Sequence, residues 1–246
     1  MSIQLADGFR ILEGEELTGD HLKQLFAAVL RESMPADELI SLNDLLQAYA
    51  PPDRRDPAAV VTDAAGQVVA GMLTDVYPRS GVLLVGYIAA RADHRGHGLG
   101  SELIRHCLRR WRTETSSSLI LLEIDDPRFH EADERYGDPS ARVRFYDRFG
   151  AVVLPLRYVQ PALYADSNRV AGMLLIALAD PSDGFVDTAT VTTFLEEYYT
   201  ACEGAVADNG SSQLIESVLV QSVDGRLPVH PLWDFATAVP NEGRPR

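Results

Sequence analysis

A glycine-rich stretch between a buried-strand pattern and an amphipathic helix pattern constrains the fold of this chain most. The apolar run 82–90 (VLLVGYIAA) is typical of a buried strand, and Arg95-Gly96-His97-Gly98-Leu99-Gly100-Ser101 follows it. A helix is predicted from Leu99 to Arg112, because apolar residues recur there at helical spacing. Glycines at such a junction let several backbone N–H groups point into one concavity, and the helix start adds the positive end of its dipole. The stretch therefore predicts an anion site suited to a pyrophosphate.

The glycine spacing excludes two common phosphate-binding loops. A P-loop needs a Gly-Lys-Ser/Thr ending, and no lysine follows the glycines here. The dinucleotide fingerprint G-x-G-x-x-G also fails, because Gly96, Gly98 and Gly100 alternate. The alternative interpretation is a tight strand-to-helix turn that serves close packing only.

The remaining periodicity indicates an α/β chain. Strands are predicted over 9–12, 58–62, 68–77, 119–124, 152–159 and 173–179, and helices over 21–32, 36–49, 141–149 and 188–204. The inward residues of the last helix would be Val191, Phe194, Leu195 and Tyr198. The segment 213–223 fits a helix or a strand equally well.

Two segments resemble signatures of the GCN5-related N-acetyltransferase (GNAT) family. The stretch 95–101 is similar to its Arg/Gln-x-x-Gly-x-Gly/Ala signature, and 144–151 (RFYDRFGA) is similar to Phe/Leu-Tyr-x-x-x-Gly-Phe, with Ala151 in place of the final Phe. The resemblance covers about 9–160. It implies an α/β fold of the GNAT acyl-CoA N-acyltransferase type, with a mixed, mostly antiparallel central sheet flanked by helices. We expect the GNAT domain to span 1–179 and a C-terminal extension, 180–246, to pack on it.

The resemblance also implies a binding mode for acetyl-CoA, which is a co-substrate in this family. The loop amides would bind its pyrophosphate, and the end of the preceding strand would pair its backbone with the pantetheine arm. An amide near Ala90 would polarise the thioester carbonyl. The residues implied are Ile88, Ala89, Ala90, Arg95, Gly96, His97, Gly98, Gly100 and Ser101.

Two residues are candidates for the proton transfers. The resemblance implies that Tyr146 protonates the departing coenzyme A thiolate, although a buried tyrosine on a short helix also fits a plain core role. A primary amine with a pKa near ~10 costs roughly 4 kcal/mol to deprotonate at pH 7, so a base is needed. Glu123 lies in an otherwise apolar strand pattern, where a charge is costly without a purpose, and it resembles the base of the family's ribosomal-protein branch. Alternatively, Glu123 is a strand-end acid that reaches solvent or pairs with an arginine such as Arg144.

Charge and composition bear on partners and compartment. The formal net charge is −14, which disfavours nucleic acid and anionic membranes and favours a cationic amine. Two distant cysteines and an N-terminus without a targeting pattern favour the cytoplasm. His94 and His97 lack a nearby cluster of further ligands in the sequence, so no metal site is expected.

We therefore predict an N-acetyltransferase that moves the acetyl group of acetyl-CoA to a primary amine by direct attack. The alternative is a non-catalytic module of the same fold that binds and senses acyl-CoA. The segment 125–140 is longer than usual for the family and is a candidate substrate lid. The segment from residue 180 either covers the acceptor side or forms a contact in a homodimer, and the sequence leaves both open.

Overall fold

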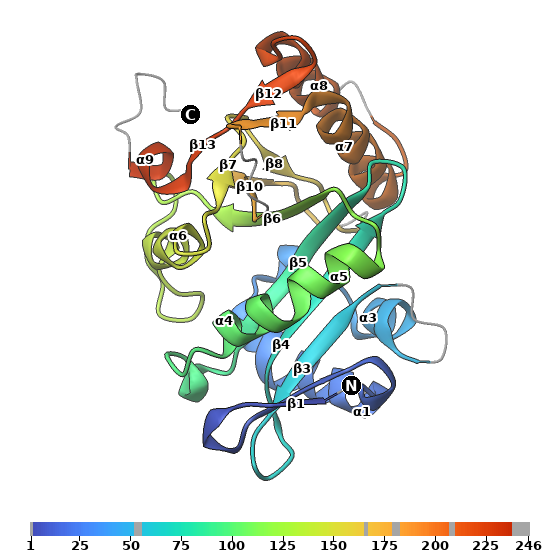
Figure 1. The fold of residues 1–246 in the computed structure, drawn as a ribbon, viewed down its shortest axis with the longest axis vertical. Helices are drawn as coiled ribbons and strands as arrows, with labels where there is room; N and C mark the ends of the chain where they lie inside the picture. The colour runs from blue at the N-terminus through green and yellow to red at the C-terminus, as the bar shows by residue number, and fades with distance from the viewer. Residues whose placement is uncertain (1, 52–55, 165–166, 179–182, 207–209, 238–246) are drawn as a thin grey trace. The chain divides into compact units, whose positions relative to one another are not determined.

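A computed structural model describes residues 2–51, 56–164, 167–178, 183–206 and 210–237 (Figure 1). The chain divides into two compact units, Met1–Ser118 and Leu119–Arg246. The domain boundary predicted at 179/180 lies outside the described residues, so it stays a prediction. The C-terminal segment forms part of the second unit, together with the elements from Leu119 onward.

The first unit is built on an antiparallel sheet whose strands follow chain order. Its neighbours all pair antiparallel, and the longest pairing joins the last two strands. The predicted strands 58–62 and 68–77 and the apolar run 82–90 are confirmed with these bounds. In order the strands are β1 (Ser2–Gln4), β2 (Arg10–Glu13), β3 (Ala58–Thr62), β4 (Val68–Tyr77) and β5 (Val82–Ala90).

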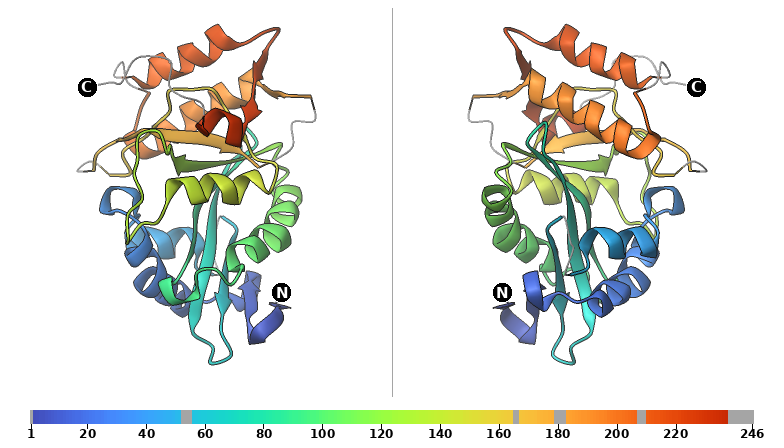
Figure 2. Two further views of the ribbon diagram at one scale, coloured as in Figure 1. Left: turned by 90° about the vertical axis from the view of Figure 1, so that its left-hand side faces the viewer. Right: turned by 90° about the vertical axis from the view of Figure 1, so that its right-hand side faces the viewer.

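Helices cover both faces of this sheet, as Figure 2 shows. One face carries α1 (Gly19–Leu25), which continues through a π-helical turn at Phe26–Leu30 into α2 (Arg31–Ser33), and α3 (Leu42–Tyr49). The helix predicted over 36–49 is too long. Residues 36–38 form a separate 3₁₀ turn, and the α-helix starts only where the Ser41 side chain accepts a hydrogen bond from the backbone of Asp44 (3.1 Å).

The opposite face carries the helix that follows the glycine stretch. It runs as α4 (Leu99–Leu103), a π-helical turn at Ile104–Leu108, and α5 (Arg109–Glu114). Its far end is joined to β2 by a buried polar cluster. Glu13, 3 % exposed, accepts hydrogen bonds from Arg110 and from the Trp111 indole (3.2 Å). Satisfying a buried carboxylate in this way fixes the helix against the strand.

The approach of α1 to β4 depends on Gly71. A Cβ at this position would lie 2.5 Å from Leu25 Cδ1, and both neighbouring faces are close-packed. Gly71→Ala is therefore expected to lower the free energy of unfolding by about 1–3 kcal/mol. Urea unfolding measures this, with Gly19→Ala as control, because a Cβ there meets its nearest neighbour only at 3.9 Å. Equal stability of the two variants would contradict the packing argument.

The second unit contains a second set of antiparallel pairings, in the order β6 (Leu119–Asp125), β10 (Met173–Ala177), β7 (Val152–Val153) and β13 (His230–Pro231). The strand predicted over 152–159 is wrong in extent: its ends are β7 and β8 (Val159–Gln160), which pair with different strands. Pro155 interrupts the run, because proline has no N–H to donate to a ladder.

Four helices complete this unit: α6 (Pro139–Asp147), α7 (Thr188–Glu203), α8 (Ser211–Gln221) and α9 (Leu232–Thr237). The predicted inward residues of α7 are all buried, and the ambiguous segment 213–223 is helical through Gln221. Two small hairpin-like pairs, β8 with β9 (Val170–Ala171) and β11 (Phe185–Asp187) with β12 (Arg226–Pro228), lie beside these elements.

Candidate functional site

The glycine stretch forms an open turn at the start of α4. Gly96 and Gly98 have φ of +86° and +77°, and Gly98 is the residue that caps the helix. A Cβ at either position would meet no atom within 4 Å, so close packing does not explain these glycines. Backbone conformation does, because side chains other than glycine rarely adopt it. The turn thus combines an unobstructed backbone with a helix start, which is the arrangement that binds anions.

The side chains of the turn are held by the protein around it. Arg95 donates a hydrogen bond to the Ser33 hydroxyl (3.3 Å). His97 lies 3.2 Å, through Nδ1, from the carbonyl oxygen of His94, and both imidazoles pack edge-on against Phe9. Anion contacts at this turn would therefore come mainly from backbone N–H groups. Within the described ranges, no group of three or more His, Cys, Asp or Glu residues is placed to hold a metal.

The end of β5 leads directly into this turn. Residues 88–90 pair with 70–72 of β4 and are half-buried, whereas residues 82–85 are buried. The register shifts at Gly86, which has no partner between the pairs Tyr87–Leu73 and Val85–Thr74. Such a bulge bends a strand and increases its twist, so the last residues of β5 leave the direction set by its buried first half.

Glu123 of β6 lies at the centre of a hydrogen-bonded cluster in the second unit. Its Oε1 accepts a hydrogen bond from the Tyr158 hydroxyl, and its Oε2 accepts from Gln160 Nε2 at 3.0 Å and from the Tyr198 hydroxyl at 3.1 Å. The carboxylate is half-buried, while its three partners are buried. Burial and the charge of Glu123 raise the pKa of Tyr158 well above its ordinary value, so this phenol remains a donor at neutral pH.

The three partners of Glu123 are the functional residues that the sequence analysis missed. Tyr158 and Gln160 are two residues apart on an extended segment, so their side chains share one face. That spacing was the available signal. Tyr198 was predicted only as an inward helix residue. Arg144, the partner suggested for Glu123, instead pairs with Asp138 (3.2 Å).

Tyr146 lies on α6 and is 6 % exposed. Its hydroxyl makes no hydrogen bond with any residue that the structure describes, and its ring packs edge-on against Phe145. Burial raises the pKa of Tyr146 well above its ordinary value, so the phenol is protonated at neutral pH. The structure therefore presents a tyrosine in the form of an acid, although it also fits the core interpretation.

Other carboxylates near β6 are bound in ion pairs. Asp126, 2 % exposed, pairs with Arg128 at 2.6 Å, and Asp125 pairs with Arg142. The segment 125–140, predicted as a candidate lid, is tied down further by His130, whose Nε2 lies 3.1 Å from the Ala171 carbonyl oxygen. These contacts anchor parts of the segment within the second unit; whether it covers a substrate stays a prediction.

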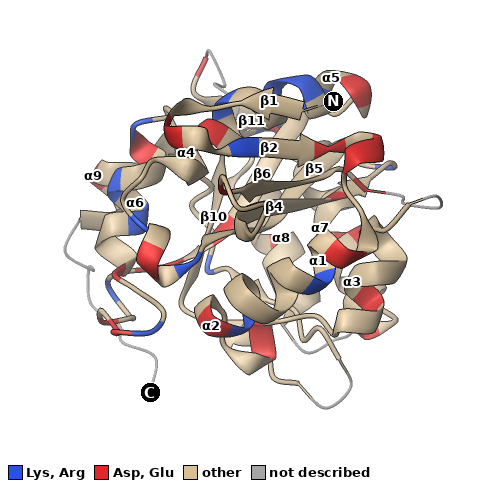
Figure 3. Cartoon of the chain, turned by 90° about the horizontal axis from the view of Figure 1, so that it is seen from below, with Lys and Arg blue, Asp and Glu red and all other residues tan. Residues whose placement is uncertain are grey.

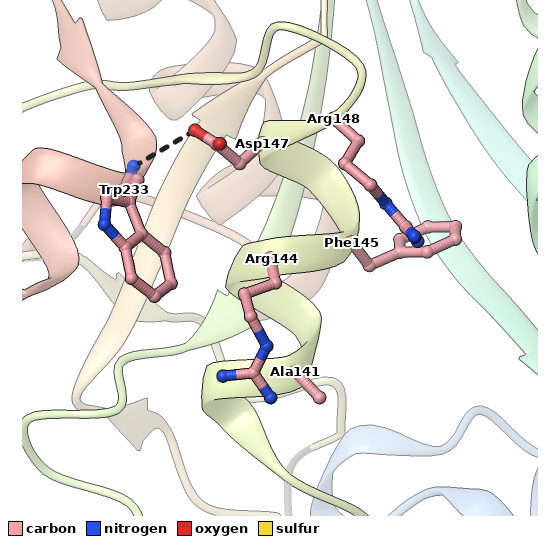
Figure 4. A pocket seen from close by; sticks show the side chains of 6 residues that line it. All are labelled: Ala141, Arg144, Phe145, Asp147, Arg148 and Trp233. Carbon is pink, nitrogen blue, oxygen red and sulfur yellow. Dashed lines mark hydrogen bonds between the residues drawn. The ribbon is translucent and has the colours of Figure 1, made fainter.

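An open groove of about 530 Å³ lies between α6 and α9 (Figure 4). Its walls include Arg144 and Trp233, and the Trp233 backbone N–H donates to Asp147 (3.3 Å). The lining residues of α6 are Ala141, Arg144, Phe145, Asp147 and Arg148. Tyr146 is not among them, so the groove and Tyr146 occupy different faces of the helix.

The distribution of charge matches the acidic composition. Acidic residues mark α1, α2 and α3, whereas α6 carries basic ones (Figure 3). Across the part of the chain that the structure describes, no helix has the length and apolar character needed to cross a membrane.

Comparison with known proteins identifies the family. The model of the acetyltransferase (GNAT) family matches residues 23–151, which is just over half of the chain. The chain belongs to the GNAT acetyltransferase family. The predicted fold class is thereby confirmed: an α/β GNAT fold with a mixed, mostly antiparallel sheet and additional C-terminal elements. The chain is accordingly a GNAT-type acetyltransferase, from a family that uses acyl-CoA.

Solved structures show the same fold at low sequence identity. A Bacteroides thetaiotaomicron protein described as a GNAT-family acetyltransferase is 20 % identical, with a TM-score of 0.51, over 68 % of this chain and 85 % of its own. The ribosomal-protein-S18-alanine N-acetyltransferase from Escherichia coli is 15 % identical, with a TM-score of 0.47, over 69 % and 92 %. No protein with a curated description matches the sequence.

Proposed function

We propose that this GNAT protein transfers the acetyl group of acetyl-CoA to a primary amine by direct attack. The observation that carries the proposal is the open glycine turn, with Gly96 and Gly98 in the left-handed region at the start of α4. Backbone N–H groups there, together with the helix dipole, suit the coenzyme pyrophosphate. The half-buried end of β5, residues 88–90, supplies backbone groups for the pantetheine arm.

Glu123 is the proposed base. The attacking amine must lose a proton, and a half-buried carboxylate can accept it directly or through water. Gln160 adds a second acceptor beside it, because its Oε1 is buried and has no hydrogen-bond partner among the described residues. Two neighbouring acceptors suit a donor-rich ligand such as an ammonium group, and the net charge of −14 favours the approach of a cation.

The proposed step balances as follows. The amine nitrogen forms a bond to the thioester carbonyl carbon and gives its proton to Glu123. The bond between that carbon and sulfur breaks, and the electron pair goes to the thiolate. The Tyr146 hydroxyl then donates its proton to the sulfur, which releases coenzyme A as the free thiol.

Tyr146→Phe tests the acid. Removing only the hydroxyl is expected to lower kcat by about 10- to 100-fold and to leave the KM for acetyl-CoA nearly unchanged. Thermal unfolding should also stay close to that of the wild type, because the hydroxyl makes no hydrogen bond with the described residues. The measurement is thiol release with a thiol-reactive dye. An unchanged kcat would assign Tyr146 to the core.

The function itself is tested by two measurements on the whole chain. Calorimetric titration with acetyl-CoA at neutral pH is expected to show saturable binding. Thiol release is then followed with a panel of primary amines, including polyamines, aminoglycosides and peptides with free N-termini. Binding together with amine-dependent release supports the proposal. Binding without release for any amine would favour the acyl-CoA-sensing alternative, and no binding by a folded sample would overturn both.

A further inference from the structure

The carboxylate of Glu123 is held in one orientation by its surroundings. Both of its oxygens accept hydrogen bonds, and the three donors come from separate segments: Tyr158, Gln160 and Tyr198. Hydrogen bonds to an ionised carboxylate stabilise the charged form and restrict its rotation. This arrangement exceeds what is needed to bury a strand-end acid that could reach solvent.

One donor belongs to the segment beyond residue 180. Tyr198 lies on α7, its hydroxyl is 3.1 Å from Glu123 Oε2, and its side chain is 4 % exposed. The ring stacks on Phe194 with centroids 5.5 Å apart. Removing the hydroxyl therefore leaves the packing of the ring in place.

The rest of α7 is fixed to the same unit by independent contacts. The Tyr199 hydroxyl donates to the Val159 carbonyl, and Glu203 pairs with Arg169 and accepts from the Ala162 backbone (3.0 Å). Tyr198 is thus presented to Glu123 by a helix that is anchored at several points rather than by a loose terminal segment.

We infer that Tyr198 is a positioning residue for Glu123, so that the helix after residue 180 takes part in acetyl transfer. The inference rests on the proposed function, because it assigns Tyr198 to the carboxylate that acts there as base. Tyr198 fixes the orientation of this carboxylate and favours its ionised form. The C-terminal segment is then required for catalysis as well as for packing.

The test compares Tyr198→Phe with Tyr199→Phe. Both remove one hydroxyl from adjacent residues of α7, but only the first removes a donor to Glu123. In protein labelled with ¹³C at glutamate carboxyls, the Glu123 signal is assigned by its loss in Glu123→Gln. The titration midpoint of that signal is expected to rise by about one pH unit in Tyr198→Phe, because a donor that favours the ionised form is lost, and to stay unchanged in Tyr199→Phe.

The same shift should appear in catalysis. The acid limb of the kcat/KM profile, measured with the best amine of the panel, is expected to move to higher pH in Tyr198→Phe alone. Other ionisable groups around the cluster are common to all variants, so they cancel in the comparison; they are Tyr158, Tyr199, Cys202, Arg169 and Glu203.

The outcomes separate this inference from the proposed function. An unchanged midpoint in Tyr198→Phe, or an equal shift in Tyr199→Phe, overturns the positioning role while an inactive Glu123→Gln still supports the base. Full turnover by Glu123→Gln overturns both the base and the catalytic role of Tyr198. Parallel shifts of the midpoint and the acid limb support the inference.

Discussion

Replacing Glu123 by glutamine is expected to lower kcat/KM by about 10²- to 10⁴-fold, the usual contribution of a general base. The affinity for acetyl-CoA should stay the same, because the glycine turn does not involve this residue. Glutamine keeps the size of the side chain but faces donors at both ends, so we also expect a loss of about 1–3 kcal/mol of stability. Activity is therefore compared at a temperature where unfolding measurements show both proteins folded.

Asp125→Asn is the matched control for this experiment. Asp125 lies on the same strand, two residues later, and pairs with Arg142. Its replacement removes a carboxylate of the same region without touching the Glu123 cluster, so kcat/KM should change by only a few-fold. A larger loss in Asp125→Asn than in Glu123→Gln would move the role of base to Asp125.

Gly98→Asp is expected to weaken acetyl-CoA binding by at least about 10²-fold. A carboxylate placed about 5 Å from the pyrophosphate costs about 3 kcal/mol at an effective dielectric constant of 20. The fold should survive, because aspartate is a favoured residue at a helix N-cap and, for a non-glycine residue, tolerates left-handed backbone comparatively well. Calorimetric titration gives the affinity, and circular dichroism on heating checks the fold.

Gly98→Asn separates charge from shape. Asparagine has nearly the same size as aspartate and accepts the same backbone conformation, but it carries no charge. We expect it to bind acetyl-CoA more tightly than Gly98→Asp by most of the predicted difference, with a similar unfolding temperature. Equal affinities of the two variants would mean that no anionic group of the coenzyme lies at this turn.

The glycine turn and the main strands could be predicted from the sequence because their signals are local. An apolar run followed by alternating glycines and a helical periodicity specifies strand, turn and helix without reference to the rest of the chain. Glu123 was also visible, as a charge inside an apolar run. Its environment was not, because Tyr158, Gln160 and Tyr198 are distant in sequence and meet only through tertiary packing.

The errors have equally specific causes. The predicted helix 36–49 ignored the capping side chain of Ser41, and the predicted strand 152–159 ignored Pro155. The short strands β1, β11, β12 and β13 have two to three residues each, too few for any periodicity to show. Their pairing partners, rather than their own residues, define them as strands.

The π-helical turn at Ile104–Leu108 has a consequence for insertions and deletions in this protein. Such a turn contains one more residue than an α-helix needs, and each residue of an α-helix advances by about 100°. Deleting one residue there would restore a regular helix but rotate everything beyond it by that angle. Trp111 and Arg110 would turn away from Glu13 and leave a buried carboxylate without donors. The surplus residue therefore sets the register between the coenzyme end of the helix and its anchored end, and its loss should be tolerated only together with a change at Glu13.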